Sequence, residues 1–130
     1  IESLTVAETD RKSHTSRITI VTRGAPHVLA QIQAQLGKVI AVRSAKDVSR
    51  DPNAVQRELA LIKVGAGEEQ RGAVLDLCDM FGAKPILVKA NAMVLRLVED
   101  QQKIADFLGL LKPFRVQEVN RSGLIAMAAD

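Results

Sequence analysis

Aromatic residues and cysteine are scarce in this sequence of 130 residues. Aromatic residues make up 2% of the chain, with no Trp or Tyr, which argues against a platform that stacks bases or sugars. The single cysteine, Cys78, excludes an internal disulfide and favours a reducing compartment. No apolar run is long enough to span a bilayer. The net charge of +3 is spread along the chain, so it does not indicate a nucleic-acid or membrane partner.

Residues that could form a catalytic or metal site are not grouped in the sequence. His14 and His27 have no Cys or carboxylate around them at metal-ligand spacing, so we interpret both as surface histidines. Cys78 lies on the apolar stripe of a predicted helix, which predicts a buried and inert thiol. The segment Gly65-Ala66-Gly67 lacks a P-loop lysine and dinucleotide-binding spacing, so it indicates a tight turn rather than an anion site.

The second half of the chain predicts a compact βαββαβ unit. Its central strand is Gln56–Val64, with Leu59 and Leu61 on one face and apolar residues on the other. The elements predicted after it are a helix over Glu68–Phe81, a hairpin of Ala83–Ala90 and Ala92–Glu99 about Asn91, a helix capped by Asp100 with Pro113 after its end, and strands over Phe114–Val119 and Leu124–Ala128. This is the ferredoxin-like order.

The first half predicts the same order without its first strand and first helix. We expect strands over Ile1–Ala7 and Arg17–Thr22, joined by a long charged loop over Glu8–Ser16. A helix then starts at Gly24-Ala25-Pro26 and is ended by a C′ glycine, Gly37. Its predicted apolar stripe is Val28, Leu29, Ile32 and Leu36, and a strand over Val39–Val42 is expected to follow. The fold class predicted for the whole chain is therefore α+β, with two ferredoxin-like units.

The predicted sheets are covered by helices on one side only, although their strands are apolar on both faces. Another domain or subunit would cover the second face, which favours a binding or regulatory module over an enzyme. RNA-binding modules share the ferredoxin-like order but stack bases on aromatic residues, and the central strands Arg57–Val64 and Ala92–Val98 contain none. An acylphosphatase-like hydrolase would need an anion-holding loop with a placed Arg and Asn, which the sequence does not show.

Four segments in order resemble the small regulatory subunit of acetolactate synthase (acetohydroxyacid synthase). They are Ile1–Val6, Leu36–Ile40, Gln56–Val64 and Glu118–Gly123. The resemblance implies a partial ACT domain at 1–48, a linker at 49–55 containing the turn Asp51-Pro52-Asn53, and a C-terminal ferredoxin-like domain at 56–130. The first strand and first helix of the family's ACT domain are absent from this sequence, so the chain is expected to begin inside that domain.

The resemblance also implies a function without catalysis by this chain. Such subunits bind the large catalytic subunit, raise its activity and confer feedback inhibition by a branched-chain amino acid, usually valine. Thiamine diphosphate, Mg²⁺ and FAD are expected on the large subunit, with no cofactor in this chain. The implied compartment is the bacterial cytoplasm, or a plastid if a transit peptide preceded residue 1.

The effector site implied by the resemblance lies between the ACT domains of two paired chains. The residues carried over to it are Ile1, Ser3, Leu4, Thr5, Val6 and Ala7. Leu4, Val6 and Ala7 would form an apolar cup and Ser3 and Thr5 would offer polar groups, while the same residues also fit a strand with one face in a core. The alternative function is a free-standing amino-acid-binding module, or a ferredoxin-like adaptor with another partner.

Overall fold

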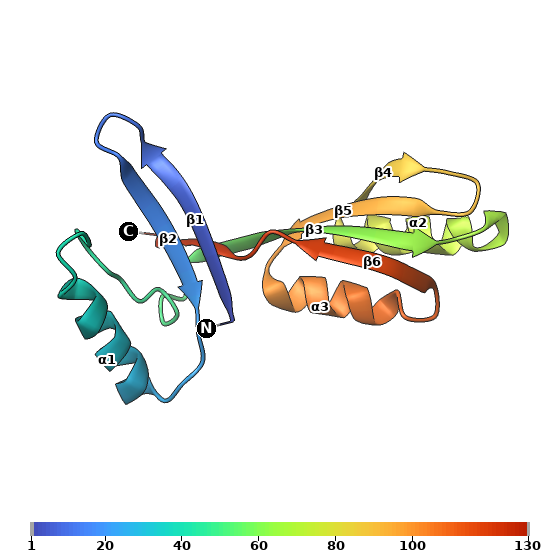
Figure 1. Cartoon of the computed structure of the whole chain (residues 1–130). Coiled ribbons are helices and arrows are strands. Elements are labelled where there is room, and N and C mark those ends of the chain that lie inside the picture. Colours follow the sequence, from blue (N-terminus) through green and yellow to red (C-terminus); the bar gives the residue numbers. More distant parts are fainter. Residues whose placement is uncertain (1, 130) are drawn as a thin grey trace. The chain divides into compact units, whose positions relative to one another are not determined.

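The computed structural model describes residues 2–129, which form two compact units (Figure 1). The first unit ends at Val55 and also includes the end of the chain from Ala126, while the second spans Gln56–Ile125. Helices and antiparallel sheets occur together. The predicted α+β class is therefore confirmed.

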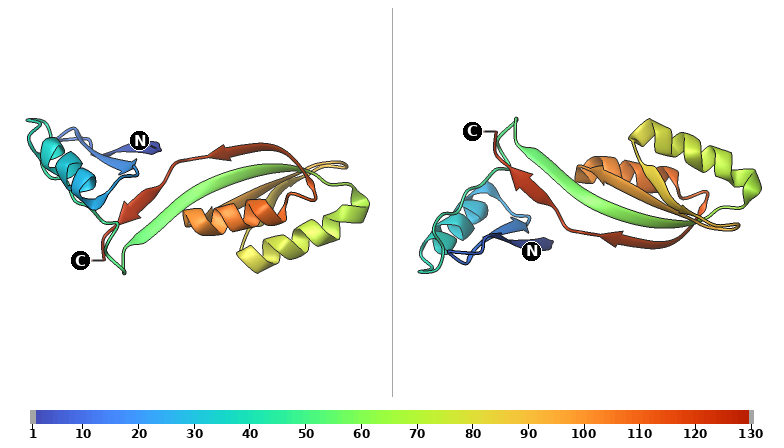
Figure 2. Two further views of the ribbon diagram at one scale, coloured as in Figure 1. Left: turned by 90° about the horizontal axis from the view of Figure 1, so that it is seen from below. Right: turned by 90° about the horizontal axis from the view of Figure 1, so that it is seen from above.

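The second unit has the strand order β4-β5-β3-β6, and β7 also pairs with β3. Its elements are β3 (Val55–Gly65), α2 (Glu68–Phe81), β4 (Lys84–Val88), β5 (Met93–Glu99), α3 (Gln101–Leu110) and β6 (Arg115–Arg121), while β7 (Ile125–Met127) begins at the last residue of this unit. Both helices lie on the same face of the sheet (Figure 2). The ferredoxin-like order predicted for this half is confirmed.

Strand β3 is central in this sheet, as the sequence predicts, because it pairs with β5 on one side and β6 on the other. Ala60, Ile62 and Val64 are fully buried in the core between the sheet and the helices. Leu59 and Leu61 point to the opposite face, where Leu59 is 37% exposed. The sheet of the second unit is therefore apolar on both faces and covered by helices on one.

Both helices of the second unit begin and end where the sequence predicts. Gly82 follows α2 with a φ of 73°, the left-handed conformation that glycine adopts most easily. The carboxylate of Asp100 accepts a hydrogen bond from the N–H of Lys103 at 2.8 Å and caps α3. The ring of Phe107, fully buried on α3, lies 5.2 Å from that of Phe81 on α2, which joins the two helices in one core.

The first unit contains an antiparallel pair of strands followed by a helix. These elements are β1 (Ser3–Asp10), β2 (Thr15–Val21) and α1 (Pro26–Gly37). The prediction of a long loop over Glu8–Ser16 is wrong, because β1 and β2 extend through most of this segment. Only the tip Arg11–His14 is a turn, and His14 adopts a φ of 53°. Polar residues can belong to these strands because Glu8–Asp10 at the end of β1, and Ser16 and Arg17 near the start of β2, are exposed to solvent.

Two predictions for the end of the first unit are also wrong. Val39–Val42 forms a turn instead of a strand: Val42 N–H bonds to the Val39 carbonyl at 3.0 Å, and Ile40 is fully exposed. A strand needs a neighbour to receive its hydrogen bonds, and no strand within residues 2–129 pairs with this segment. Gly37 is the last helical residue, and the cap is Lys38 in the right-handed α conformation.

The apolar stripe predicted for α1 is present, but no residue of that helix is buried. Val28 is 37% and Ile32 is 36% exposed, while Leu29 and Leu36 are partly buried. The helix forms because Pro26 lies at its first turn and the apolar spacing is helical. Within residues 2–129, no element covers the apolar stripe of α1 fully enough to bury one of its residues.

Candidate functional site

Strand β1 carries an exposed apolar face. Leu4 and Val6 are 58% and 57% exposed, and they lie opposite Ile20 and Ile18 of β2. Because directly paired residues of an antiparallel sheet share a face, these four side chains form one surface, which we call the β1–β2 apolar face. Ile18 is 55% exposed, so apolar contact area remains available to a ligand or another polypeptide.

The opposite face of β1 carries two buried hydroxyl groups. The Oγ atom of Ser3 and the Oγ1 atom of Thr5 are shielded from solvent, and neither has a hydrogen-bond partner within residues 2–129. A buried hydroxyl without a partner costs free energy, because its hydration is lost without compensation. Each hydroxyl can donate one hydrogen bond and accept others, so it could bind either the ammonium or the carboxylate group of an amino acid.

The predicted effector residues therefore lie on two faces of the same strand. Leu4 and Val6 belong to the β1–β2 apolar face, whereas Ser3, Thr5 and Ala7 alternate with them on the other face. Ile1 lies outside the described residues. Within residues 2–129, β1 pairs only with β2, so its other edge offers free backbone donors and acceptors. A ligand that contacts both faces would have to lie across that edge.

The turn at the tip of the β1–β2 hairpin is exposed and charged. The carboxylate of Asp10 accepts hydrogen bonds from the Ser13 hydroxyl at 2.9 Å and the Lys12 N–H at 3.0 Å. Both hydrogen bonds hold the pKa of Asp10 below its ordinary value, and the bond from the Ser13 hydroxyl has the larger effect. Arg11 and Lys12 lie between Asp10 and Ser13 in the sequence, within the turn that these hydrogen bonds order. The tip therefore presents two cations on a locally ordered turn.

Cys78 lies in the core of the second unit, as its place on the apolar stripe predicts. Burial raises the pKa of its thiol, which keeps the sulfur protonated and unreactive. His14 and His27 are both exposed, as expected. Among the described residues, no group of three or more His, Cys, Asp or Glu side chains is placed to hold a metal ion.

A polar contact that the sequence analysis missed joins the two ends of the second unit. The buried carboxylate of Glu58 on β3 binds the guanidinium of Arg121 and the N–H of Gly123. Next to it, the Ser122 hydroxyl accepts a hydrogen bond from the N–H of Leu59. The signal for this contact was an acidic residue on the strand face that also carries Ala60, Ile62 and Val64, because a buried carboxylate needs a partner. The contact connects two of the segments on which the family resemblance depends.

Comparisons with known proteins agree with this architecture. Residues 57–130 match the family described as small subunit of acetolactate synthase. A probable acetolactate synthase small subunit of Archaeoglobus fulgidus is 35% identical over 127 residues, covering 98% of this chain and 78% of that protein. The acetolactate synthase small subunit of Mycolicibacterium smegmatis is 34% identical over 128 residues, covering 98% of this chain and 74% of that protein.

A solved structure extends the similarity to the fold. The crystal structure of the acetolactate synthase small subunit from Thermotoga maritima superposes with a TM-score of 0.80 at 31% identity, covering 97% of this chain and 78% of that one. Fold and comparisons together define a non-catalytic subunit of a larger enzyme. The chain belongs to the family of acetolactate synthase small subunits, as the resemblance predicts. None of the helices within residues 2–129 is long and apolar enough to cross a membrane.

Proposed function

We propose that this chain binds the large, thiamine-diphosphate-dependent subunit of acetolactate synthase, raises its activity and makes it sensitive to feedback inhibition by valine. The observation that carries the proposal is family membership across nearly the whole chain, with relatives that are themselves named small subunits. Mg²⁺ and FAD would accompany thiamine diphosphate on the large subunit. The complex would work in the cytoplasm, or in a plastid, since a chloroplastic small subunit of Nicotiana plumbaginifolia is 35% identical over 130 residues, covering 100% of this chain and 28% of that protein.

The proposed effector site is the β1 strand of a partial ACT domain at 1–48, separated by a linker at 49–55 from the domain at 56–130. Two chains would pair through these ACT domains, with valine at the interface. The buried hydroxyls of Ser3 and Thr5 support a polar role, because each lacks a partner within residues 2–129 that a bound amino acid would supply. Leu4, Val6 and Ala7 would provide apolar contacts, and Ile1 would extend the same strand.

Feedback inhibition requires valine to bind one quaternary state better than another. A site shared between two chains satisfies this requirement, because a small rotation of the pair changes both halves of the site. The β1–β2 tip would carry the change to the large subunit, because its charges are exposed and its turn is held by the Asp10 hydrogen bonds. Valine would then act by weakening or reorienting that contact.

The experiment is acetolactate formation by a cognate large subunit, with and without this chain, across a valine titration. Higher activity that valine suppresses is the expected result. Activation without valine sensitivity would keep the partnership and reject the effector site within this chain. If a folded chain produces no change in rate, the regulatory role is wrong and the free-standing amino-acid-binding module or adaptor takes its place.

A further inference from the structure

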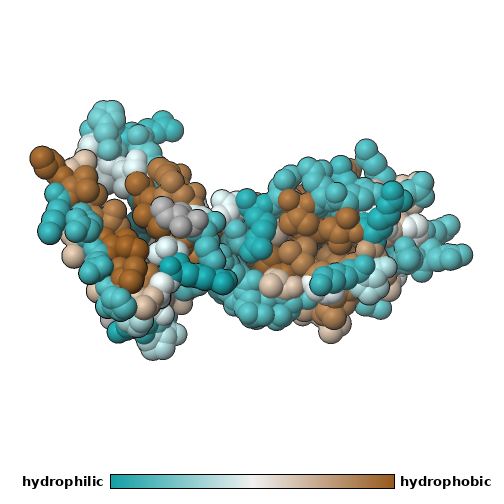
Figure 3. All heavy atoms as spheres, turned by 60° about the horizontal axis from the view of Figure 1, so that its bottom comes forward, coloured by the Kyte–Doolittle hydropathy of each residue, from teal (hydrophilic) through white to brown (hydrophobic). Residues whose placement is uncertain are grey.

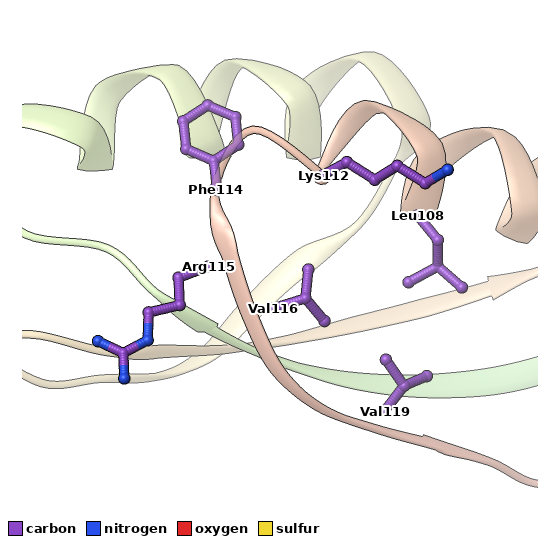
Figure 4. Close-up of a pocket in the computed structure, with 6 residues that line it drawn as sticks. All are labelled: Leu108, Lys112, Phe114, Arg115, Val116 and Val119. Atoms are coloured by element: carbon purple, nitrogen blue, oxygen red, sulfur yellow. The ribbon is translucent and has the colours of Figure 1, made fainter.

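A shallow apolar groove of about 500 Å³ lies between α3 and β6 of the second unit (Figure 4). Leu108 of α3 and Val116 and Val119 of β6 line it, together with Phe114 from the segment that connects these two elements. Figure 3 shows apolar side chains gathered on this side of the second unit. An exposed surface of this kind is typical of a site where another polypeptide binds.

The two valines belong to the face of the sheet that the helices cover. Val119 lies opposite Ile62 and Val116 lies opposite Val64, and both residues of β3 are fully buried beneath the helices. Directly paired residues of an antiparallel sheet share a face, so Val116 and Val119 also point toward the helix layer. They are nevertheless 37% and 36% exposed. The layer formed by α2 and α3 therefore leaves part of β6 uncovered.

Two cations flank the apolar residues of the groove. Lys112 and Arg115 are exposed, and neither forms an ion pair within residues 2–129. Figure 4 shows their side chains extending to opposite sides of Leu108, Val116 and Val119. None of the six residues that line the groove is acidic. An apolar centre with a charged rim is the usual anatomy of a protein–protein interface, and here the rim is cationic.

The shape and charge of the groove favour a helix as the bound element. A small molecule would remain largely exposed in a shallow groove, whereas small-molecule sites bury most of the ligand surface. An amphipathic helix has one apolar stripe with polar residues on both sides of it. Acidic residues on both sides of such a stripe would meet both cations. The added helix would pack beside α3 at the usual interaxial distance of about 8–10 Å and extend the helix layer over β6.

We propose that this groove binds an acidic amphipathic helix of the large subunit. The apolar stripe of that helix would cover Leu108, Val116 and Val119, and its carboxylates would pair with Lys112 and Arg115 across the rim. This inference rests on the proposed function, because it assigns the same partner a contact on the second unit in addition to the hairpin tip. The apolar contacts would set the lifetime of the complex, and the cations would speed its formation.

The first test places a carboxylate on the floor of the groove. Val119→Glu in the full chain should weaken binding to a cognate large subunit by about tenfold or more, mainly through faster dissociation. The matched control is Val88→Glu on β4, at the opposite edge of the sheet, where the side chain is 51% exposed. Surface plasmon resonance would measure both rates, and circular dichroism would verify that both variants fold. Equal affinities for the two variants would overturn the proposal.

The second test reverses the charge of the rim. Lys112→Glu combined with Arg115→Glu should slow association severalfold at low salt, and the difference from the natural chain should shrink at high salt. Lys84→Glu combined with Lys89→Glu is the matched control, because both lysines are exposed near the opposite edge and the change in net charge is the same. Equal association rates for the two double variants would show that only net charge matters, which contradicts a cationic rim.

The third test identifies what occupies the groove. A photoreactive cross-linker on Val119→Cys should attach to a helix of the large subunit that carries Asp or Glu on both sides of an apolar stripe, while the buried Cys78 stays unlabelled. A cross-link to a segment without acidic residues, or to another copy of this chain, would overturn the proposal. If the natural chain binds and activates the large subunit but the groove variants match their controls, only this inference is wrong. If the natural chain does not bind, the proposed function is wrong as well.

Discussion

The Oε1 atom of Glu58 accepts hydrogen bonds from Nε and Nη2 of Arg121 at 3.1 and 2.5 Å, while its Oε2 atom accepts one from the N–H of Gly123 at 2.9 Å. Glu58 is 5% exposed, so its charge depends on these partners rather than on water. The contact holds the end of β6 against the start of β3. It also fixes the chain just before β7 begins.

Arg121→Ala should destabilise the second unit by about 1–3 kcal/mol, because it leaves a buried carboxylate with fewer hydrogen bonds. Glu58→Gln should cost less, since an amide oxygen can still accept from the Gly123 N–H. Urea unfolding followed by circular dichroism would measure both changes. Arg57→Ala is the control, because Arg57 is exposed and, among the described residues, its side chain bonds only to the neighbouring Gln56 carbonyl, so its effect should stay within about 0.5 kcal/mol. Equal losses for Arg121 and Arg57 would contradict the role of the contact.

The elements of the second unit could be predicted because their local signals agree with their packing. The stripe containing Val74 and Cys78 predicts the buried face of α2, and Gly82 and Asp100 mark helix ends that the structure shows. At the end of the first unit, a local signal had no neighbour within residues 2–129 to support it. Val39–Val42 has strand-forming residues, but no described strand lies beside it to receive its hydrogen bonds.

The candidate site was only partly predictable for a related reason. Alternation along β1 separates Leu4 and Val6 from Ser3 and Thr5, and the structure shows that separation. Which face is shielded depends on what covers the sheet, and the sequence of one strand does not contain that information. Apolar side chains are usually buried and hydroxyl groups usually exposed, but on β1 the side chains of Leu4 and Val6 are exposed and the hydroxyls of Ser3 and Thr5 are buried.

Thr5→Val tests whether the buried hydroxyl serves a ligand. Removing a buried polar group that has no partner should stabilise the chain, by about 1 kcal/mol, because the desolvation cost disappears while the shape is kept. The same change should weaken valine inhibition of the complex if the hydroxyl binds the effector. Thermal unfolding and a valine titration would be measured in parallel. Thr19→Val, at the position paired with Thr5, is the matched control. Unchanged inhibition in Thr5→Val would exclude the hydroxyl from the site.

Cys78 should make stability depend on alkaline pH. Burial raises the pKa of its thiol in the folded chain above the ordinary value of 9.0, so the unfolded chain loses this proton first as the pH rises. The stabilisation that the protonated Cys78 thiol gives the folded chain is therefore fully present below about pH 9. It is lost as the pH rises through the folded-state pKa of that thiol. The unfolding free energies of the natural chain and Cys78→Ala, compared from pH 7 to 10, should converge above pH 9. A constant difference would contradict the pKa shift.

The hairpin tip should act in activation and not in folding. Arg11→Ser with Lys12→Ser removes both cations but keeps the Asp10 bonds, because these come from the Lys12 backbone and the Ser13 hydroxyl. We expect the double variant to dimerise as before and to lose most of its activation of the large subunit. Sedimentation velocity and the acetolactate assay would measure the two properties. Arg17→Ser removes a cation from exposed β2, outside the turn, and should keep activation. Full activation by the double variant would show that the large subunit binds elsewhere on this chain.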